Sequence, residues 1–261
     1  MDASKIKEKI GRFRILVIGR ANAGKTTILQ RVCNTRENPE IYNSTGEKVG
    51  IIMPRGEHDI KNEMVFRNNP GFIFHDSCGF ESGGESEFDK MKAFIASRSK
   101  KCKLKDQLHA IWYCIPMEED CRSFTKGETK FFKECDTGSI IPLLTVHRGL
   151  FTKFDALYDV AYAQLKSMGK LMEEARELAP KHAKESFAKG SQLKFLYHSE
   201  DIQRPPKHHI CLPDMDKDHA DCELLIERTA RSLDDDEVLQ QLFVSTQRTN
   251  LELCMKCAVE R

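Results

Sequence analysis

The stretch Gly19-Arg-Ala-Asn-Ala-Gly-Lys-Thr-Thr27 decides the fold, because it has the spacing G-x-x-x-x-G-K-[ST] of a phosphate-binding loop. It follows the apolar run Ile15-Leu-Val-Ile18, which we expect to be a buried strand, and a helix is expected over 25–33. In such a loop the glycines let backbone N–H groups and the helix N-terminus face phosphate oxygens. The sequence therefore predicts a strand, a phosphate loop and a helix, in that order.

The residues of this loop have distinct expected roles. We expect Lys25 to bridge the β and γ phosphates of a nucleotide, Thr26 to offer its hydroxyl to Mg²⁺, and Thr27 to help hold the α phosphate. The remaining contacts are expected from the other loop residues, which are Gly19, Asn22, Ala23 and Gly24. Which phosphate compound binds has to be read from motifs elsewhere in the chain.

Apolar runs and amphipathic stretches alternate along the chain, which is typical of an α/β fold. Strands are expected at 14–18, 63–66, 72–75, 109–115, 140–146 and 209–212. Helices are expected at about 25–33, 87–99, 126–135, 156–190 in one or two pieces, 220–233 and 235–259. The turn Asn68-Asn-Pro-Gly71 makes its flanking strands an antiparallel hairpin at the sheet edge. The prediction is a three-layer P-loop NTPase fold, with a mostly parallel six-stranded sheet, one antiparallel edge strand and helices on both faces.

The composition excludes several classes of protein. The chain has 261 residues, of which 40% are hydrophobic, enough for a full core. Its 41 Lys and Arg residues nearly equal its 40 Asp and Glu residues, so no global charge favours a nucleic acid or an anionic membrane. The N-terminus lacks the apolar segment of a signal peptide, and no apolar run approaches the roughly 18 residues that span a bilayer. We expect a cytoplasmic protein with ten reduced cysteines, no transmembrane segment and no nucleic-acid partner.

Two further motifs follow expected strands, where ligands of such sheets bind. Asp76-Ser-Cys-Gly79 has the form D-x-x-G: Asp76 is expected to hold Mg²⁺ through a water, and the Gly79 amide to sense a γ phosphate. Thr152-Lys-Phe-Asp155 has the form T-K-x-D, and Lys153 is expected to lie along a base. The Asp155 carboxylate is expected to accept two hydrogen bonds from the guanine edge, which adenine cannot supply. The sequence therefore favours GTP over ATP.

With these motifs in this order, the chain resembles the translation-factor-like (TRAFAC) class of P-loop GTPases, the group that contains Ras, Era, septins and the AIG and Toc families. The resemblance covers about 12–232, and within the class the chain looks most like uncharacterised single-G-domain proteins of fungi. It implies a G domain over 12–233, an N-terminal extension over 1–11 and a C-terminal helical extension, packed on the G domain, over 234–261. It also implies GTP or GDP and Mg²⁺ as cofactors, and slow hydrolysis of GTP to GDP and phosphate. Switch segments at about 36–60 and 77–100 would report the γ phosphate.

Other motifs of the family match less well. The threonine of the first switch, which reaches Mg²⁺ and the γ phosphate, is best matched by Thr45, with Ser44 as a rival. The last base-contacting loop follows the sixth strand at Cys211 and Leu212, where the resemblance implies backbone contacts alone. Thr152 stands where asparagine is more frequent, and His147-Arg-Gly149 interrupts the approach to the T-K-x-D motif. These departures leave an ATPase as an alternative.

Cleavage is a separate question. Ras-like members carry a glutamine after D-x-x-G that orients the attacking water, whereas this chain has Phe80. Asn22 matches an asparagine of potassium-activated members, so K⁺ binding and a loop-stabilising role are both open. Arg20 is another candidate charge donor, within one chain or across a homodimer, and an activating protein is a further one. A GTP-binding module without turnover is the remaining alternative. The residues that we assign to catalysis are Lys25, Thr45, Gly79 and Asn22.

The remaining features carry less information. His58 lies in the first switch segment, where a surface or capping role is the more frequent one. Cys254 and Cys257 fall on one helical face without a second ligand pair, which favours helix packing over zinc. The stretch 156–203 is too long for one ordinary helix, and we expect part of it to form a partner surface or a homodimer contact.

Overall fold

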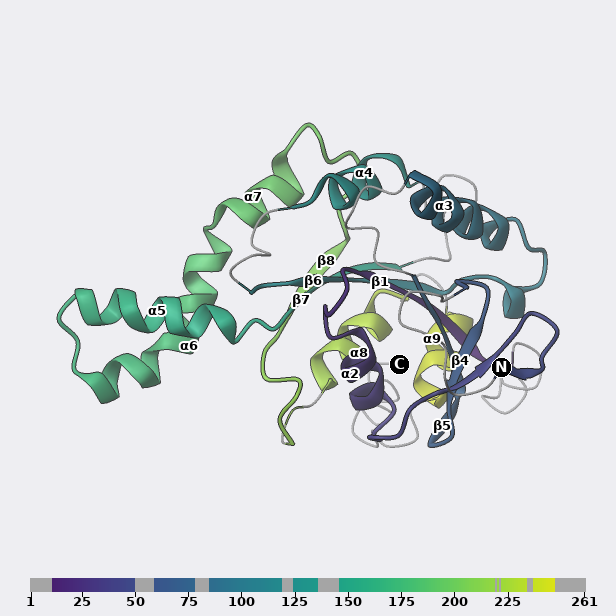
Figure 1. Ribbon diagram of the computed structural model, residues 1–261, viewed down its shortest axis with the longest axis horizontal. Helices are drawn as coiled ribbons and strands as arrows, with labels where there is room; N and C mark the ends of the chain where they lie inside the picture. Colours follow the sequence, from purple (N-terminus) through teal and green to yellow (C-terminus); the bar gives the residue numbers. More distant parts are fainter. Residues whose placement is uncertain are drawn as a thin grey trace.

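One sheet lies at the centre of the molecule (Figure 1). The computed structural model describes residues 11–49, 59–77, 85–118, 124–135, 146–218, 220, 222–233 and 237–246. Within these residues, eight strands pair in the order β3-β2-β4-β5-β1-β6-β7-β8. The strands are β1 (Phe13–Gly19), β2 (Glu40–Tyr42), β3 (Lys48–Val49), β4 (Glu63–Phe66), β5 (Asn69–Asp76), β6 (Ala110–Pro116), β7 (Val146–Thr152) and β8 (His208–Leu212).

The sheet is mostly parallel, as predicted, but the predicted count of six strands is wrong. β5, β1, β6, β7 and β8 are parallel, and β4 is antiparallel to β5 in the expected hairpin. β4 is not the edge, because β2 pairs antiparallel with it and β3 pairs antiparallel with β2. These two strands have only three and two residues, and no apolar run signals them. They are held by backbone pairing with β4, which local sequence does not encode.

The predicted strand at 140–146 ends too early. The strand in the structure is Val146–Thr152, and residues 140–145 lie outside the described ranges. His147, Arg148 and Gly149 are part of this strand and pair with Ile111, Trp112 and Tyr113 of β6. A Cβ at Gly149 would lie 3.3 Å from the side chain of Pro206. The expected interruption is therefore absent from the described backbone, and β7 leads directly into Thr152.

Helices cover both faces of the sheet. In Figure 1, α2, α8 and α9 lie on one side of it and α3, α4 and α7 on the other. The segment 156–190, predicted to be helical in one or two pieces, contains two helices. The helix that follows it, α7, was not predicted. The helices are α2 (Lys25–Val32), α3 (Glu85–Ser99), α4 (Lys126–Glu134), α5 (Ala156–Ser167), α6 (Met172–Ala188), α7 (Ser191–His198), α8 (Glu223–Arg231) and α9 (Glu237–Thr246), with a 3-10 turn at Leu104–Asp106.

Two hydrophobic clusters fill the layers between the sheet and the helices. Along β1 the buried side chains alternate, because successive residues of a strand point to opposite faces. Ile15 and Val17 belong to the first cluster, which α2, α8 and α9 cover. Leu16 and Ile18 belong to the second cluster, which lies under the helices from α3 to α7. The carboxyl ends of the central strands are thereby fixed from both sides, and loops at these ends have a rigid base.

The C-terminal part of the described chain packs into the first cluster. Leu239, Leu242 and Phe243 of α9 are fully buried, and the Phe243 ring lies 4.8 Å from that of Phe13.

The helices α5 and α6 form a hairpin that projects from the body of the molecule (Figure 1). Searched over the described ranges, the helices include none that is long and apolar enough to cross a membrane. The predicted boundaries of the domain over 12–233, with an extension before it and another after it, stay a prediction.

Candidate functional site

The phosphate loop joins β1 to α2, at the place that the sequence predicts. Gly19 ends β1, and Gly24, with a φ of +76°, is the residue before the first turn of α2. Asn22 has a φ of +58°, and the Ala23 N–H donates to the Arg20 carbonyl at 3.2 Å, so the loop turns back on itself. The first N–H groups of a helix have no acceptor within it. The loop and helix start therefore form a cradle of donors suited to an anion.

Lys25, the first residue of α2, folds back over this loop. Its Nζ donates to the carbonyls of Gly19 at 3.0 Å and Arg20 at 3.1 Å. The same ammonium lies 3.8 Å from Oδ1 of Asp76, and the lysine side chain is only 12% exposed. The ammonium therefore lies at the mouth of the loop, where a bound phosphate would replace the two carbonyls as acceptor.

Asp76 ends β5 beside the loop. It lies opposite Val17 of β1, and the N–H of Ser77 donates to the Val17 carbonyl at 3.1 Å. The Ser77 hydroxyl is buried and has no hydrogen-bond partner among the described residues. Gly79 and Phe80, like His58, Cys254 and Cys257, lie outside the described ranges. The structure thus brings Asp76 to Lys25, and the roles of Gly79 and Phe80 stay predictions.

A cavity of about 330 Å³ opens next to the loop. It brings together four segments that are far apart in the sequence: the start of α2, Glu118 after β6, the T-K-x-D motif after β7 and the loop after β8. A volume of this size accommodates a small ligand with polar groups at its edge. The lining residues are Gly24, Thr27, Ile28, Glu118, Thr152, Lys153, Asp155, Ala156, Met215 and Asp216.

The T-K-x-D residues present polar groups to this cavity. Asp155 precedes α5, and its Oδ1 accepts a hydrogen bond from the N–H of Asp214 at 2.8 Å. Lys153 has a φ of +51°, and its Nζ lies 2.6 Å from Oε1 of Glu118. Thr152 is buried, and its hydroxyl has no hydrogen-bond partner among the described residues. Burial first, and then the carboxylates of Asp214 and Asp155, raise the pKa of the adjoining Tyr158 to about 12. The cavity edge is thus acidic, which suits hydrogen-bond donors on a ligand.

The loop after β8 is held by an arginine that sequence reasoning missed. Arg31 of α2 donates from Nε to the Met215 carbonyl at 3.0 Å. Its Nη2 donates to the carbonyls of Asp216 at 3.2 Å and Lys217 at 2.6 Å. Charge-assisted bonds to successive carbonyls fix a turn strongly. No local motif marks Arg31, because its partners lie more than 180 residues away in the sequence.

Backbone contacts were predicted at Cys211 and Leu212, but these residues belong to β8. The Leu212 carbonyl accepts the N–H of Phe154 at 3.3 Å, and the cavity wall comes from Met215 and Asp216 instead. From the sequence, the run Asp214-Met-Asp-Lys-Asp218 is expected to be the polar loop after the sixth strand, and the structure has turns there, but none of its residues was assigned to the site. Neither Cys211 nor Leu212 is among the residues that line the cavity.

The side chain of Arg20 points into the protein. It is 7% exposed, and its guanidinium donates to both carboxylate oxygens of Glu128, at 2.9 and 2.7 Å. Glu128 is 1% exposed and also accepts the N–H of Thr125 in the capping box that begins α4. The guanidinium of Arg20 is thus already paired within the chain, and its role as a charge donor stays a prediction. The pair attaches the phosphate loop to α4.

Other predicted residues take simpler places. Thr26 and Asn22 are exposed on the loop and helix start, and Ala23 is buried. Thr45 lies in the exposed turn between β2 and β3, with its hydroxyl 2.6 Å from Oδ1 of Asn43 and 3.1 Å from Oε2 of Glu47. Two strands, β4 and β5, separate β2 from β1 in the sheet. The role of Thr45 at Mg²⁺ stays a prediction and requires this turn to rearrange.

Comparison with known proteins gives likeness to solved structures alone. No protein-family model matches the chain, and no curated protein matches it. A probable GTP-binding protein engB is 14% identical with a TM-score of 0.38, over 84% of this chain and 97% of that chain. Cdc11 from Saccharomyces cerevisiae is 13% identical with a TM-score of 0.32, over 68% and 62%. A variant of SsGBP is 15% identical with a TM-score of 0.36, over 89% and 59%. Identities and TM-scores of this size establish neither a family nor a function.

Proposed function

We propose that this protein binds a guanine nucleoside triphosphate together with Mg²⁺ and hydrolyses it slowly to the diphosphate and phosphate. The observation that carries the proposal is the cavity of about 330 Å³, whose wall combines the phosphate loop, the T-K-x-D motif and the loop after β8. Asp155 lines this cavity, and Lys25 follows Gly24, which also lines it, as we expect of a site that holds both the base and the phosphates of a nucleotide.

Recognition of the base depends on Asp155. Guanine presents two neighbouring N–H donors along one edge, and a carboxylate can accept from both. The Asp214 N–H already fixes one oxygen of Asp155 at 2.8 Å, so the carboxylate is oriented before a ligand arrives. Adenine lacks these donors and would leave the carboxylate unpaired, so the protein should bind an adenine nucleotide much more weakly than a guanine nucleotide. The Thr152 hydroxyl, which lacks a partner among the described residues, is a further polar group at this edge.

The phosphates would lie over the loop. Lys25 would transfer its ammonium from the Gly19 and Arg20 carbonyls to phosphate oxygens. The residues present fit Mg²⁺ by their donor atoms, because the hydroxyl of Thr26, an exposed residue at the helix start, and the carboxylate of Asp76 at the end of β5 are oxygen ligands. When bound, Mg²⁺ would neutralise part of the phosphate charge. Thr27, which lines the cavity, would contact the α phosphate.

Hydrolysis would be slow because the usual water-orienting glutamine is replaced by Phe80. Water would attack the γ phosphorus, and the bond to the bridging oxygen of the diphosphate would break. What this chain supplies is positioning and charge, chiefly from Lys25 and the loop amides. K⁺ at Asn22 or a protein partner would raise the rate. If K⁺ binds at Asn22, the unaltered protein should release phosphate faster in K⁺ than in Na⁺. In Asn22→Ala the difference between the two salts should be smaller.

The decisive test exchanges the base preference. In Asp155→Asn an amide N–H₂ replaces one carboxylate oxygen, so the site gains a donor and loses an acceptor. We expect affinity for GTP to fall by at least about tenfold, and affinity for xanthosine triphosphate, which has an oxygen in place of the guanine amino group, to rise. Titration of fluorescent nucleotide analogues measures both. Glu118→Gln is the matched control, since it changes a lining carboxylate that pairs with Lys153. An unchanged GTP preference in Asp155→Asn would contradict the proposal.

Two alternatives differ from this proposal in one measurement each. A binding module without turnover is favoured by Phe80, and phosphate release under multiple-turnover conditions decides it. An ATPase is favoured by Thr152 in the place of asparagine, and competition of ATP with a labelled guanine nucleotide decides it. The uninterrupted path of β7 into Thr152 removes the other ground for an ATPase.

A further inference from the structure

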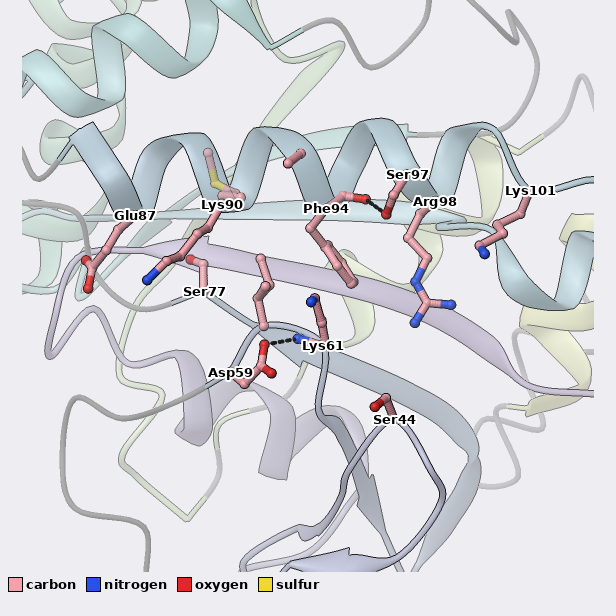
Figure 2. Close-up of a pocket in the computed structure, with 13 residues that line it drawn as sticks. Ser44, Asp59, Lys61, Ser77, Glu87, Lys90, Phe94, Ser97, Arg98 and Lys101 are labelled. Atoms are coloured by element: carbon pink, nitrogen blue, oxygen red, sulfur yellow. Dashed lines mark hydrogen bonds between the residues drawn. The ribbon is translucent and has the colours of Figure 1, made fainter.

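A second and larger cavity lies on the opposite side of β5 from the first hydrophobic cluster. Its volume is about 830 Å³, and it forms a groove between α3 and the chain at 59–61 (Figure 2). Ser77, the residue after Asp76, lies in its wall, so the groove adjoins the candidate nucleotide site without being part of its cavity. We refer to it as the α3 groove.

The floor of the α3 groove is apolar. Phe94 and Met91 are buried in the second hydrophobic cluster, and half-buried Ile60 packs against that cluster. The Phe94 ring lies 5.0 Å from the buried ring of His75 on β5. Ala93, an exposed residue of α3, also lines the groove. Its small side chain leaves room for a ligand beside the helix. The groove therefore has a fixed apolar surface for a side chain of a ligand.

The rim of the groove is cationic. Lys61, Lys90 and Lys101 are exposed, and none of the three ammonium groups has an ion pair or hydrogen bond within the part of the chain that the structure describes. Arg98 donates to the Asp106 carbonyl at 3.0 Å, and its guanidinium lies 5.3 Å from the centre of the Phe94 ring.

Two carboxylates oppose these four cations. They are Asp59, whose Oδ1 accepts the backbone N–H of Lys61 at 3.0 Å, and Glu87. Since four cations face two carboxylates, the rim favours an anionic ligand.

The spacing of the cations indicates the size of the ligand. Figure 2 shows Lys90 toward one end of α3, Arg98 and Lys101 toward the other, and Phe94 between them. Lys90 and Arg98 are about 12 Å apart along the helix axis, at about 1.5 Å per residue. An extended peptide covers this distance with about four residues. We propose that the α3 groove binds a short acidic segment of a partner protein, with carboxylates at both ends and an apolar side chain on Phe94.

The probe is the hexapeptide fluorescein-Glu-Asp-Leu-Phe-Asp-Glu-amide, labelled at its N-terminus, added to the full chain and followed by fluorescence anisotropy. We expect it to bind at low ionic strength and to weaken as salt screens the exposed charges. The neutral counterpart, with Gln for Glu and Asn for Asp, should bind at least about fivefold more weakly. Nucleotide is left out, so failure of the nucleotide proposal does not affect this result.

Two sets of variants locate the site. Lys61→Gln combined with Lys90→Gln and Lys101→Gln should weaken the acidic peptide about tenfold. Lys181→Gln combined with Lys184→Gln and Lys189→Gln makes the same change in net charge at exposed positions on and beside α6, and should leave binding within about twofold. Ala93→Trp fills the groove without changing charge and should also weaken the peptide.

Several outcomes would overturn the proposal. They are no binding at low salt, equal binding of the neutral peptide, equal loss in both triple variants, or unchanged binding in Ala93→Trp. An oligothymidylate that binds more tightly than the peptide, with the same loss in the groove variant, would assign the α3 groove to nucleic acid instead.

Discussion

At the scale of single residues, Gly19 shows how close packing fixes the phosphate loop. A Cβ at this position would lie 2.6 Å from the backbone oxygen of Cys114 on β6. Gly19→Ala must therefore separate β1 from β6 or distort the loop, and we expect the free energy of unfolding to fall by about 1–3 kcal/mol. Binding of a nucleoside triphosphate should weaken by at least about tenfold. Urea unfolding and nucleotide titration measure the two effects.

The control for this variant is Gly169→Ala. Gly169 has a φ of +86°, but no atom lies within 4 Å of where its Cβ would be. The substitution should cost about 1 kcal/mol from backbone strain alone and leave nucleotide binding unchanged. Equal losses of binding in the two variants would contradict the role of the Cys114 contact.

His75 makes stability depend on pH. It is buried, with Nε2 3.2 Å from the Arg14 guanidinium and Nδ1 3.0 Å from the carbonyls of Ile60 and Asn62. Burial, followed by the charges of Arg14 and Arg98, lowers the pKa of His75 to about 3. Nδ1 therefore carries the hydrogen and donates, and Nε2 accepts.

The sign of the effect follows from the direction of the pKa shift. Because the folded pKa is below the unfolded value of about 6.5, the unfolded chain takes up the proton first as pH falls. The stability contribution is present above pH 6.5 and is lost toward pH 3, by about 1.4 kcal/mol per pH unit.

His75→Gln should reduce this dependence on pH, by less than one full proton between about pH 7 and about pH 5.5, where urea unfolding measures it. His109, whose pKa is lowered to about 4 chiefly by burial, would still contribute. His208→Gln, at the exposed start of β8, controls for the substitution itself. An unchanged slope in His75→Gln would contradict this account.

At the scale of elements, hydrogen bonds from Arg31 connect α2 to the loop after β8. In Arg31→Gln the carbonyls of Met215, Asp216 and Lys217 lose their charged donor, so the cavity wall should loosen. We expect the Kd for a guanine nucleotide to rise about tenfold, while the Kd for tripolyphosphate, which makes no base contact, stays the same. Isothermal titration measures both ligands.

The matched control is Arg36→Gln, which removes an exposed arginine that pairs with Asp218 in the same loop. An exposed pair contributes about 0–1 kcal/mol, so both Kd values should stay near those of the unaltered protein. Equal weakening of nucleotide and tripolyphosphate in Arg31→Gln would mean that the arginine supports α2 in general rather than the cavity wall.

Elements also show what the sequence can predict. The strand, loop and helix around Gly19 to Thr27 were predictable because glycine spacing and apolar runs are local signals. The end of β7 was not, because the apolar run stops at Val146, and the residues after it form a strand through pairing with β6 and β8. Arg31, Glu118 and Met215 were missed for a related reason: each acts through contacts with segments distant in sequence.

At the scale of the whole molecule, α9 joins the end of the described chain to its beginning. Phe243 of α9 is fully buried, with its ring 4.8 Å from Phe13 of β1 and 5.6 Å from Phe72 of β5. β1 leads into the phosphate loop and β5 ends at Asp76, so α9 supports both strands that position the candidate site. The C-terminal extension is therefore expected to be needed for the stability of the predicted G domain.

Phe243→Ala tests this expectation, because it leaves a cavity where three aromatic rings meet. We expect the free energy of unfolding to fall by about 3–5 kcal/mol, measured by urea denaturation. Leu224→Ala on α8, where the side chain is 45% exposed, should change it by no more than about 0.5 kcal/mol. If Phe243→Ala were as stable as Leu224→Ala, α9 would be a dispensable appendage, and the phosphate loop would owe its position to β1, β5 and β6 alone.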